Sequence, residues 1–355
     1  MKRIVVCCDG TWNKPDQARP TNVVKIALAV APRGPDGVEQ RTHYLPGVGT
    51  RRGEIIRGGA FGWGLSRAVR EAYTAVADDY EPGDEIFLLG YSRGAYTARS
   101  AAGFLRNAGI LRPEHRDRLD EAYALYRSRS KSTAPGARKA ELFRRSYAYP
   151  DLAIRFVGVF DTVGSLGIPG SSIPIVRWFN KRWSFHDTQL SRSVTAAYQA
   201  LAIDEQRTTF QPTLWDLPEP APGQVLEQAW FAGCHSNVGG GAPDTGLSDL
   251  ALGWIARMAA GQGLAFANGA FVAGRHLEAG DATTVPFVPD ALGPIGRSRT
   301  GIFKLWPPYI RPIGEKEHGN ESLASSAVAR HAARPTDQPE NLIEALTRPH
   351  RVTEV

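Results

Sequence analysis

The stretch 85-EIFLLGYSRGAYTAR-99 joins a short apolar run to a Gly-x-Ser-x-Gly motif centred on Ser92. Residues 85–89 predict a buried strand, and residues 95–107 predict a helix that begins directly after the motif. A strand, a tight turn and a helix are the context in which a nucleophilic serine stands exposed at the end of a sheet strand. A chance motif is the alternative in a chain with 37 glycines, but the flanking elements favour a nucleophilic role for Ser92.

The composition limits the number of domains and the classes of partner that the protein can have. The 355 residues suffice for one large domain or two small ones, and 42% of them are hydrophobic, which is enough for a sizeable core. The formal net charge of +6 permits contact with anionic surfaces such as lipid headgroups, but the basic residues are spread along the chain. Because neither an aromatic-rich RNA motif nor zinc-finger spacing is present, we expect no nucleic-acid partner and at most transient contact with a membrane surface.

The N-terminal region and the cysteines indicate in which cellular compartment the protein is found. The apolar run over residues 4–8 is too short for a signal-peptide core, and no stretch reaches the length of a membrane-spanning helix. The cysteines are Cys7, Cys8 and Cys234, an odd number with two adjacent members, which favours reduced core thiols. We therefore predict a cytoplasmic protein, with export by a non-classical secretion system still open. The sequence does not indicate an oligomeric state.

Strands and helices are expected to alternate along the chain. The predicted strands cover residues 4–8, 42–45, 85–89, 153–160 and 228–234. The predicted helices cover residues 21–31, with Thr21 as N-cap, and 65–79, 95–107, 191–201 and 247–260, with two surface helices within 113–145. This alternation predicts the α/β class, with a mainly parallel sheet and helices on both of its faces.

Two stretches are interpreted separately from this alternation of strands and helices. Residues 166–200 begin with isoleucines, prolines and tryptophans in no regular order, and we interpret them as a cap or lid over a site. Residues 336–355 are polar and are predicted to be a loose tail. A single domain over residues 1–335 is the expected organisation.

A nucleophilic serine needs a histidine as base and a carboxylate that orients the histidine. Asp161 and His235 each follow a predicted buried strand, and the order Ser92, Asp161, His235 is that of α/β hydrolases. Because parallel strands end at one edge of a sheet, the three side chains should meet there. Alternatively, Asp161 caps a turn and His235 is an ordinary core histidine. The rival acids are Asp204 and Asp244, and the reserve histidines are His186 and His318.

An oxyanion hole needs two N–H groups. The residue after the nucleophile, Arg93, is expected to supply one. The turn after the first strand suits the other, so Gly10 N–H or Thr11 N–H is the expected donor. Asp9 is interpreted as a carboxylate that holds this turn in shape. A haloacid-type phosphatase would need an aspartate as nucleophile at the position of Cys7, so the sequence argues against that class of enzyme. No metal-ligand spacing appears, so we predict neither a metal nor another cofactor.

Several motifs carry a family resemblance, and they stand in the order 9-DGTWN-13, 47-GVGT-50, 90-GYSRGAYTAR-99, 157-VGVFDTVG-164 and 230-WFAGCHSNVGGG-241. Together they resemble an uncharacterised α/β hydrolase family that includes the type VI secretion phospholipase effectors of the first lipase class. The resemblance covers roughly residues 3–330. It implies an α/β-hydrolase-like fold with Ser92, Asp161 and His235 as nucleophile, acid and base.

Three positions depart from that family's pattern. Gln199 stands where a second histidine is common, Asn237 where an aspartate is common, and Ala324 where a histidine is frequent. We also expect the large membrane-binding additions of the secreted effectors to be absent at this length. Serine hydrolysis therefore follows more directly from the resemblance than a phospholipid substrate does.

We therefore expect a serine hydrolase of carboxylic esters, with lipid or phospholipid esters as the leading substrate class. Ile175, Trp178 and Phe179 are predicted to bind the acyl chain of the substrate, and the cationic residues among them suit an anionic headgroup. The alternative is an ordinary core helix whose cations extend to the surface. A non-catalytic binding module and an amide or peptide hydrolase are the alternative functions. The complete set of serine, acid and histidine argues against the binding module.

Overall fold

The computed structural model describes residues 1–11, 13–14, 16–49, 60–164, 189–272, 276–279, 283–334 and 339–355. Its main sheet contains β1 (Lys2–Cys8), β2 (Glu39–Leu45), β3 (Glu85–Tyr91), β4 (Ile154–Phe160), β5 (Val194–Ala202), β6 (Val225–Phe231), β9 (Glu321–Ala324) and β10 (Val352–Thr353). A separate hairpin consists of β7 (His276–Ala279) and β8 (Thr283–Pro286).

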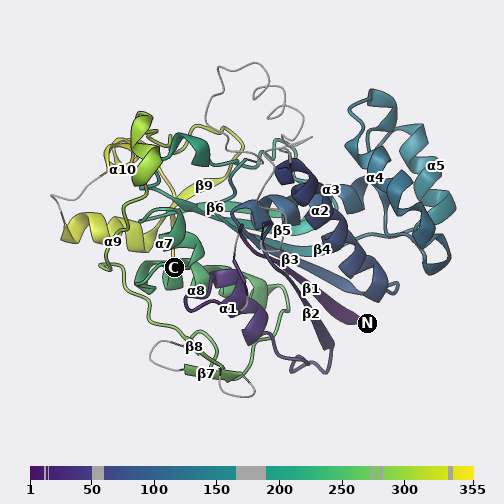
Figure 1. Cartoon of the computed structure of the whole chain (residues 1–355), viewed down its shortest axis with the longest axis horizontal. Helices are drawn as coiled ribbons and strands as arrows, with labels where there is room; N and C mark the ends of the chain where they lie inside the picture. The colour runs from purple at the N-terminus through teal and green to yellow at the C-terminus, as the bar shows by residue number, and fades with distance from the viewer. Residues whose placement is uncertain are drawn as a thin grey trace.

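The helices connect these strands. The α-helices are α1 (Asn22–Ala29), α2 (Ala60–Asp79), α3 (Arg93–Ala108), α4 (Leu119–Arg127), α5 (Arg138–Tyr147), α7 (His235–Gly239), α8 (Gly246–Gly261), α9 (Ser325–Ala333) and α10 (Glu340–Leu346). Short 3-10 helices are η2 (Pro113–Arg118), η3 (Lys131–Thr133), η4 (Thr208–Phe210) and η5 (Gly301–Leu305). Figure 1 shows α4 and α5 beyond one end of the sheet and α9 and α10 beyond the other.

The strand order of the main sheet defines where a ligand can bind. The described strands run in the order β10-β9-β6-β5-β4-β3-β1-β2, and every neighbouring pair is parallel. After β1 the chain forms β2, which pairs with one edge of β1, and it then forms β3, which pairs with the opposite edge of β1. The loops after β1 and β3 therefore lie next to each other at a topological switch point, where open α/β sheets bind ligands.

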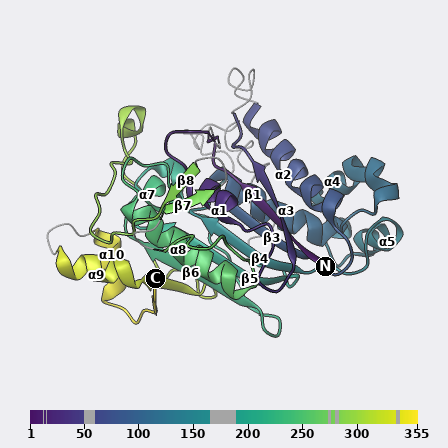
Figure 2. The same ribbon diagram turned by 90° about the horizontal axis from the view of Figure 1, so that it is seen from below.

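Helices cover both faces of the sheet. Along β1, Ile4 and Val6 belong to one buried apolar cluster, with residues of α2 and α3, while Val5 and Cys7 belong to a second, with residues of α1 and α8. In the view of Figure 2, α1 and α8 lie in front of the strands. Strands buried on both faces appear in a sequence as continuous apolar runs, which is why they could be recognised there.

The predicted fold class is confirmed, because the chain forms a mostly parallel sheet with helices in an α/β-hydrolase-like fold. The strand and helix on either side of Ser92 are β3 and α3, and the surface helices within 113–145 are α4 and α5. Thr21 caps α1 as predicted, since its hydroxyl oxygen accepts a hydrogen bond from Val24 N.

One predicted helix is wrong. The stretch 194-VTAAYQALA-202 is rich in alanine, which favours helix by itself. In the structure it is β5, which pairs with β4 and β6 and is almost entirely buried. Its small side chains fit a strand between two helix layers, so packing overrides local propensity. The predicted cap over 166–200 therefore cannot include β5, and its residues up to 188 lie outside the described residues.

The loose tail predicted over 336–355 is wrong for the part that the structure describes. There, α10 buries Leu342 and Ala345, and the Asn341 amide donates to two backbone carbonyls. The strand β10 then pairs with β9 and extends the main sheet. A few buried contacts thus order a stretch whose average composition is polar.

A buried ion pair joins α1 to α8. Lys25 Nζ lies 2.6 Å from Asp249 Oδ1, and both side chains are fully buried. Asp249 Oδ2 also accepts hydrogen bonds from Thr245 Oγ1 and Val288 N. The carboxylate therefore connects the two helices to the segment that follows β8.

Lys25→Met should destabilise the fold by about 3–5 kcal/mol, because it leaves the Asp249 carboxylate buried without its cation. Chemical denaturation of the variant measures this loss of unfolding free energy. The double variant K25M/D249N should recover much of it, since no buried charge is then left unpaired. A single variant as stable as the wild type would show that the pair does not hold these helices together.

Candidate active site

Ser92 lies on a strained turn between β3 and α3. Its φ is +58° and its ψ is −120°, a conformation that few non-glycine residues adopt. The flanking glycines make the turn sterically feasible: a Cβ at Gly90 would lie 2.5 Å from Gly94 O, and one at Gly94 would lie 2.1 Å from Cys8 O. The Gly-x-Ser-x-Gly pattern is thus required by the close approach of β1, β3 and α3.

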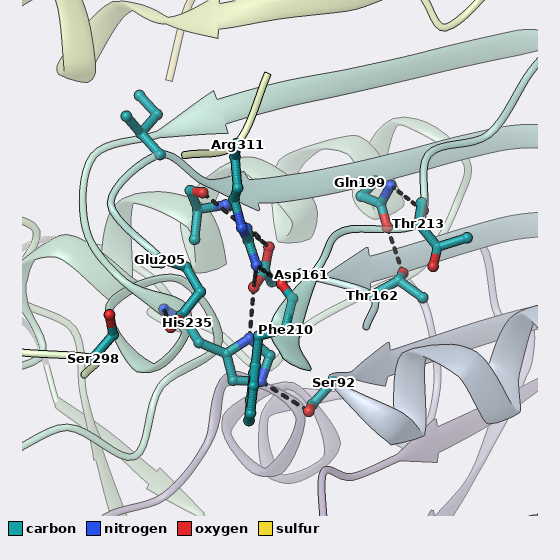
Figure 3. A network of polar contacts seen from close by, with 12 residues as sticks. Ser92, Asp161, Thr162, Gln199, Glu205, Phe210, Thr213, His235, Ser298 and Arg311 are labelled. Carbon is teal, nitrogen blue, oxygen red and sulfur yellow. Dashed lines mark hydrogen bonds and ion pairs between the residues drawn. The ribbon is translucent and has the colours of Figure 1, made fainter. Parts of the chain in front are cut away.

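His235 and Asp161 reach the serine from two other strand ends. His235 begins α7 after β6, and Asp161 follows β4 with a φ of +42°. His235 Nε2 lies 2.8 Å from Ser92 Oγ, and His235 Nδ1 lies 2.5 Å from Asp161 Oδ2. Figure 3 shows the three side chains in this continuous hydrogen-bonded arrangement. The structure therefore brings together the three residues that the sequence singled out.

This arrangement can carry out proton transfer at a serine hydroxyl. When Nδ1–H of His235 donates to Asp161, Nε2 has its lone pair directed at the Ser92 hydroxyl and can accept its proton. Burial lowers the pKa of His235 below its ordinary value of 6.5, against the opposing effect of Asp161. The imidazole is therefore neutral at pH 7, as a general base must be.

Asp161 has a further partner that the sequence analysis missed. The fully buried Arg311 places Nη1 2.6 Å from Asp161 Oδ1 and Nη2 3.0 Å from Oδ2, which forms a two-pronged ion pair. Burial alone would raise the pKa of Asp161, but Arg311 and His235 outweigh it and hold that pKa well below its usual range. Arg311 lies in an irregular, proline-rich segment, so no sequence periodicity could have indicated its role.

A second ion pair lies beside the histidine. Glu205 Oε2 accepts a hydrogen bond from His235 N at 3.2 Å and lies 2.8 Å from Arg207 Nη2. The Arg207 guanidinium stacks on the Phe210 ring, 3.4 Å from its centroid, and Phe210 packs edge-on against His235 at 4.9 Å. This group of side chains fixes the position of α7 and of the imidazole ring.

The turn predicted to supply the second oxyanion donor lies against Ser92. A Cβ added to Gly10 would be 3.3 Å from Ser92 Cβ. However, Gly10 N–H donates to Asp9 Oδ1 at 2.6 Å, so the carboxylate of the turn already occupies it. Of the two residues that the sequence left open, Thr11 is therefore the better candidate, alongside Arg93 at the start of α3.

Asp9 shapes this turn, in agreement with the interpretation of the sequence. Its Oδ2 accepts hydrogen bonds from Tyr44 Oη at 2.7 Å and Thr21 Oγ1 at 2.8 Å. Burial raises the pKa of Asp9 to about 6, although these hydrogen bonds and that from Gly10 act in the opposite direction. The carboxylate thus ties the turn to β2 and to the N-terminus of α1.

The rival candidates do not join the site. Asp204 Oδ2 accepts from Gly233 N, and Asp244 Oδ1 accepts from Gly246 N, so both carboxylates support local backbone. The His318 side chain is half-exposed beside Glu317. Four other candidates, namely Ile175, Trp178, Phe179 and His186, lie outside the described residues.

The three departures from the family pattern occupy structural positions. Gln199 accepts a hydrogen bond from the hydroxyl of Thr162, the residue after Asp161 (Figure 3). Its amide nitrogen donates to Gln228 Oε1 at 2.8 Å. Asn237 Oδ1 accepts from Gly296 N at 2.9 Å, and Ala324 is fully buried at the end of β9. Gln199 thus belongs to a buried polar network that supports the Asp161 loop.

Comparison with known proteins shows a family. Residues 2–258 match the family described as type VI secretion phospholipase effector Tle1-like, catalytic domain. The uncharacterized protein YEL023C of Saccharomyces cerevisiae is 27% identical over 231 residues, which cover 59% of this chain and 32% of that protein. The chain therefore spans about a third of the length of this curated relative.

Two solved structures are also similar to the chain. One is an uncharacterized protein from Pseudomonas aeruginosa, with a TM-score of 0.45 and 17% identity, covering 75% of this chain and 46% of that one. The other is the Tle1 effector bound to the VgrG spike of the type VI secretion system, with a TM-score of 0.40 and 18% identity, covering 68% of this chain and 52% of that one.

Among the helices that the structure describes, none is both long and apolar enough to cross a membrane.

Asp9→Ala should destabilise the protein by about 3 kcal/mol, because it removes the acceptor of the hydrogen bonds from Gly10 N, Tyr44 Oη and Thr21 Oγ1. Asp9→Asn should cost less than about 1 kcal/mol, since its amide oxygen can accept from Gly10 N while the hydroxyls of Tyr44 and Thr21 rotate to accept from its NH₂. Denaturant unfolding of both variants measures the difference. Equal losses would show that Asp9 is needed as an ion rather than as an anchor for the turn.

Proposed function

Because the chain belongs to the Tle1-like catalytic-domain family of type VI secretion phospholipase effectors, we propose that it is a serine hydrolase that cleaves lipid esters through an acyl-enzyme. The observation that carries this proposal is the hydrogen-bonded series from Ser92 through His235 to Asp161 at the switch point of the sheet. The strained turn at Ser92 supports it as well, because strain of this kind concentrates at functional sites.

In the proposed mechanism, Ser92 Oγ attacks the ester carbonyl carbon while His235 Nε2 takes its proton. N–H groups of Arg93 and Thr11 stabilise the oxyanion that forms. The bond from the carbonyl carbon to the alcohol oxygen then breaks, and His235 returns the proton to that oxygen. Water, deprotonated by the same nitrogen, attacks the acyl-enzyme, releases the carboxylic acid and regenerates Ser92. Asp161 keeps the proton on Nδ1 throughout.

Apolar side chains beside the histidine support a lipid substrate. Phe210 contacts His235, and Phe303 of η5 packs edge-on against Phe210 with 6.3 Å between ring centroids. At the end of η5, Leu305 is 77% exposed next to the exposed Lys304. In Figure 2 the yellow-green η5 projects from the body of the molecule. Apolar side chains with a cation beside them suit an acyl chain and an anionic headgroup.

The nucleophile can be tested directly. Ser92→Ala should reduce ester hydrolysis by several orders of magnitude and abolish labelling by a fluorophosphonate, because members of such a triad act as a unit. Ser100→Ala, a buried serine further along α3, is the matched control and should keep both activity and labelling. Labelling that persists in the Ser92 variant would identify another nucleophile.

The substrate class follows from a series of nitrophenyl esters of increasing acyl length. If the acyl chain is buried, each added methylene should raise kcat/KM about fourfold until the site is full, which corresponds to about 0.8 kcal/mol per CH₂. Release of fatty acid from phosphatidylglycerol vesicles, measured beside the series, tests the lipid substrate itself. A preference for acetyl over octanoyl esters would contradict a lipid substrate while leaving the serine mechanism in place.

A further inference from the structure

The Arg311 guanidinium is held in one orientation by four hydrogen bonds. Besides its two contacts with Asp161, Nη1 donates to Ala202 O at 2.8 Å and Nη2 to Phe210 O at 2.6 Å. The Arg311 carbonyl in turn accepts from the Asn341 amide at 2.9 Å, and the same amide donates to Ile203 O at 3.1 Å. Arg311 is thus fixed by the end of β5, by η4 and by α10.

The Asp161 carboxylate has donors on both of its oxygens. Oδ1 accepts from Arg311 Nη1 and from Ala202 N, while Oδ2 accepts from Arg311 Nη2 and contacts His235 Nδ1. A carboxylate that faced only a histidine would direct its whole negative charge at the imidazole. Here the charge is shared with a fully buried cation, which weakens the stabilisation of an imidazolium.

We propose that Arg311 is a positioning residue that orients the Asp161 carboxylate and, by balancing its charge, lowers the basicity of His235. This inference rests on the proposed serine mechanism, in which His235 is the base. It also assigns a role to the segment beyond the family match, since that match ends at residue 258. Arg311 and its anchor Asn341 both come from this later segment, which therefore completes the site.

The other groups around His235 do not balance the negative charge of Asp161 as Arg311 does. On the side of α7, Glu205 and Arg207 form their own ion pair, so their charges largely cancel. The Tyr91 and Cys234 side chains are buried, and burial raises the pKa of each, so both remain neutral at pH 7. Ser92 is likewise neutral. Removing Arg311 therefore leaves one uncompensated negative charge, that of Asp161, beside the imidazole.

The experiment is an NMR titration of the His235 ring in protein with labelled histidine, with its signal among the 8 histidines assigned from a His235→Asn variant. Arg311→Met should raise the pKa of His235 by about one unit, a tenfold gain in proton affinity. Arg311→Lys, which keeps the charge but loses the two-pronged contact, should give a smaller rise. Arg330→Met, which removes another buried arginine of the later segment, is the matched control and should leave that pKa unchanged.

If Arg311→Met fails to fold, two other comparisons decide. Arg311→Lys should still raise the His235 pKa, and D161N/R311M, which buries neither charge, should show a higher pKa than Asp161→Asn alone. Unchanged pKa values in the folded variants would overturn the proposal and leave Arg311 as a merely structural residue. The titration needs no turnover, so its outcome is separate from that of the ester assays, which test the proposed function.

Discussion

The carboxylate of Asp161 is fully buried, and a charge without water must be satisfied by protein groups. Its donors come from three places far apart in the sequence: His235 at the start of α7, Ala202 at the end of β5 and Arg311 in the later segment. Satisfying this one group therefore requires that the main sheet, η4 and the segment that leads to α10 take their final places together. The architecture around the serine depends on that requirement.

The parallel sheet supplies the geometry that this requirement needs. Every strand of the main sheet points the same way, so the residues after β1, β3, β4 and β6 arrive at one edge. At the switch point, Gly94 lets α3 approach the end of β1 so closely that the turn after β1 lies against Ser92. The positions of Ser92, His235, Asp161 and the turn after β1 thus follow from the parallel topology of the sheet and from a small number of glycines.

Sequence reasoning could predict those parts of the candidate site that follow apolar strands. Ser92, Asp161 and His235 could be found because each comes directly after a run buried on both faces. It failed where tertiary packing overrides local preference, as in the alanine-rich β5, and where a few buried contacts order a polar stretch, as in α10. The role of Arg311 could not be predicted from the sequence. Arg311 lies in an irregular segment, and its contact with the Asp161 carboxylate forms only in the folded chain.

The contact between Asp161 and Arg311 spans 150 residues of sequence, which has a consequence for synthesis on the ribosome. Residues 92 and 161 leave the exit tunnel long before residue 311 does. Until then the Asp161 carboxylate has no buried cation and stays hydrated, because burying it unpaired costs several kcal/mol. The nascent chain therefore carries Ser92 with an incomplete set of partners, and the full arrangement around Asp161 forms only when the later segment has emerged and docked.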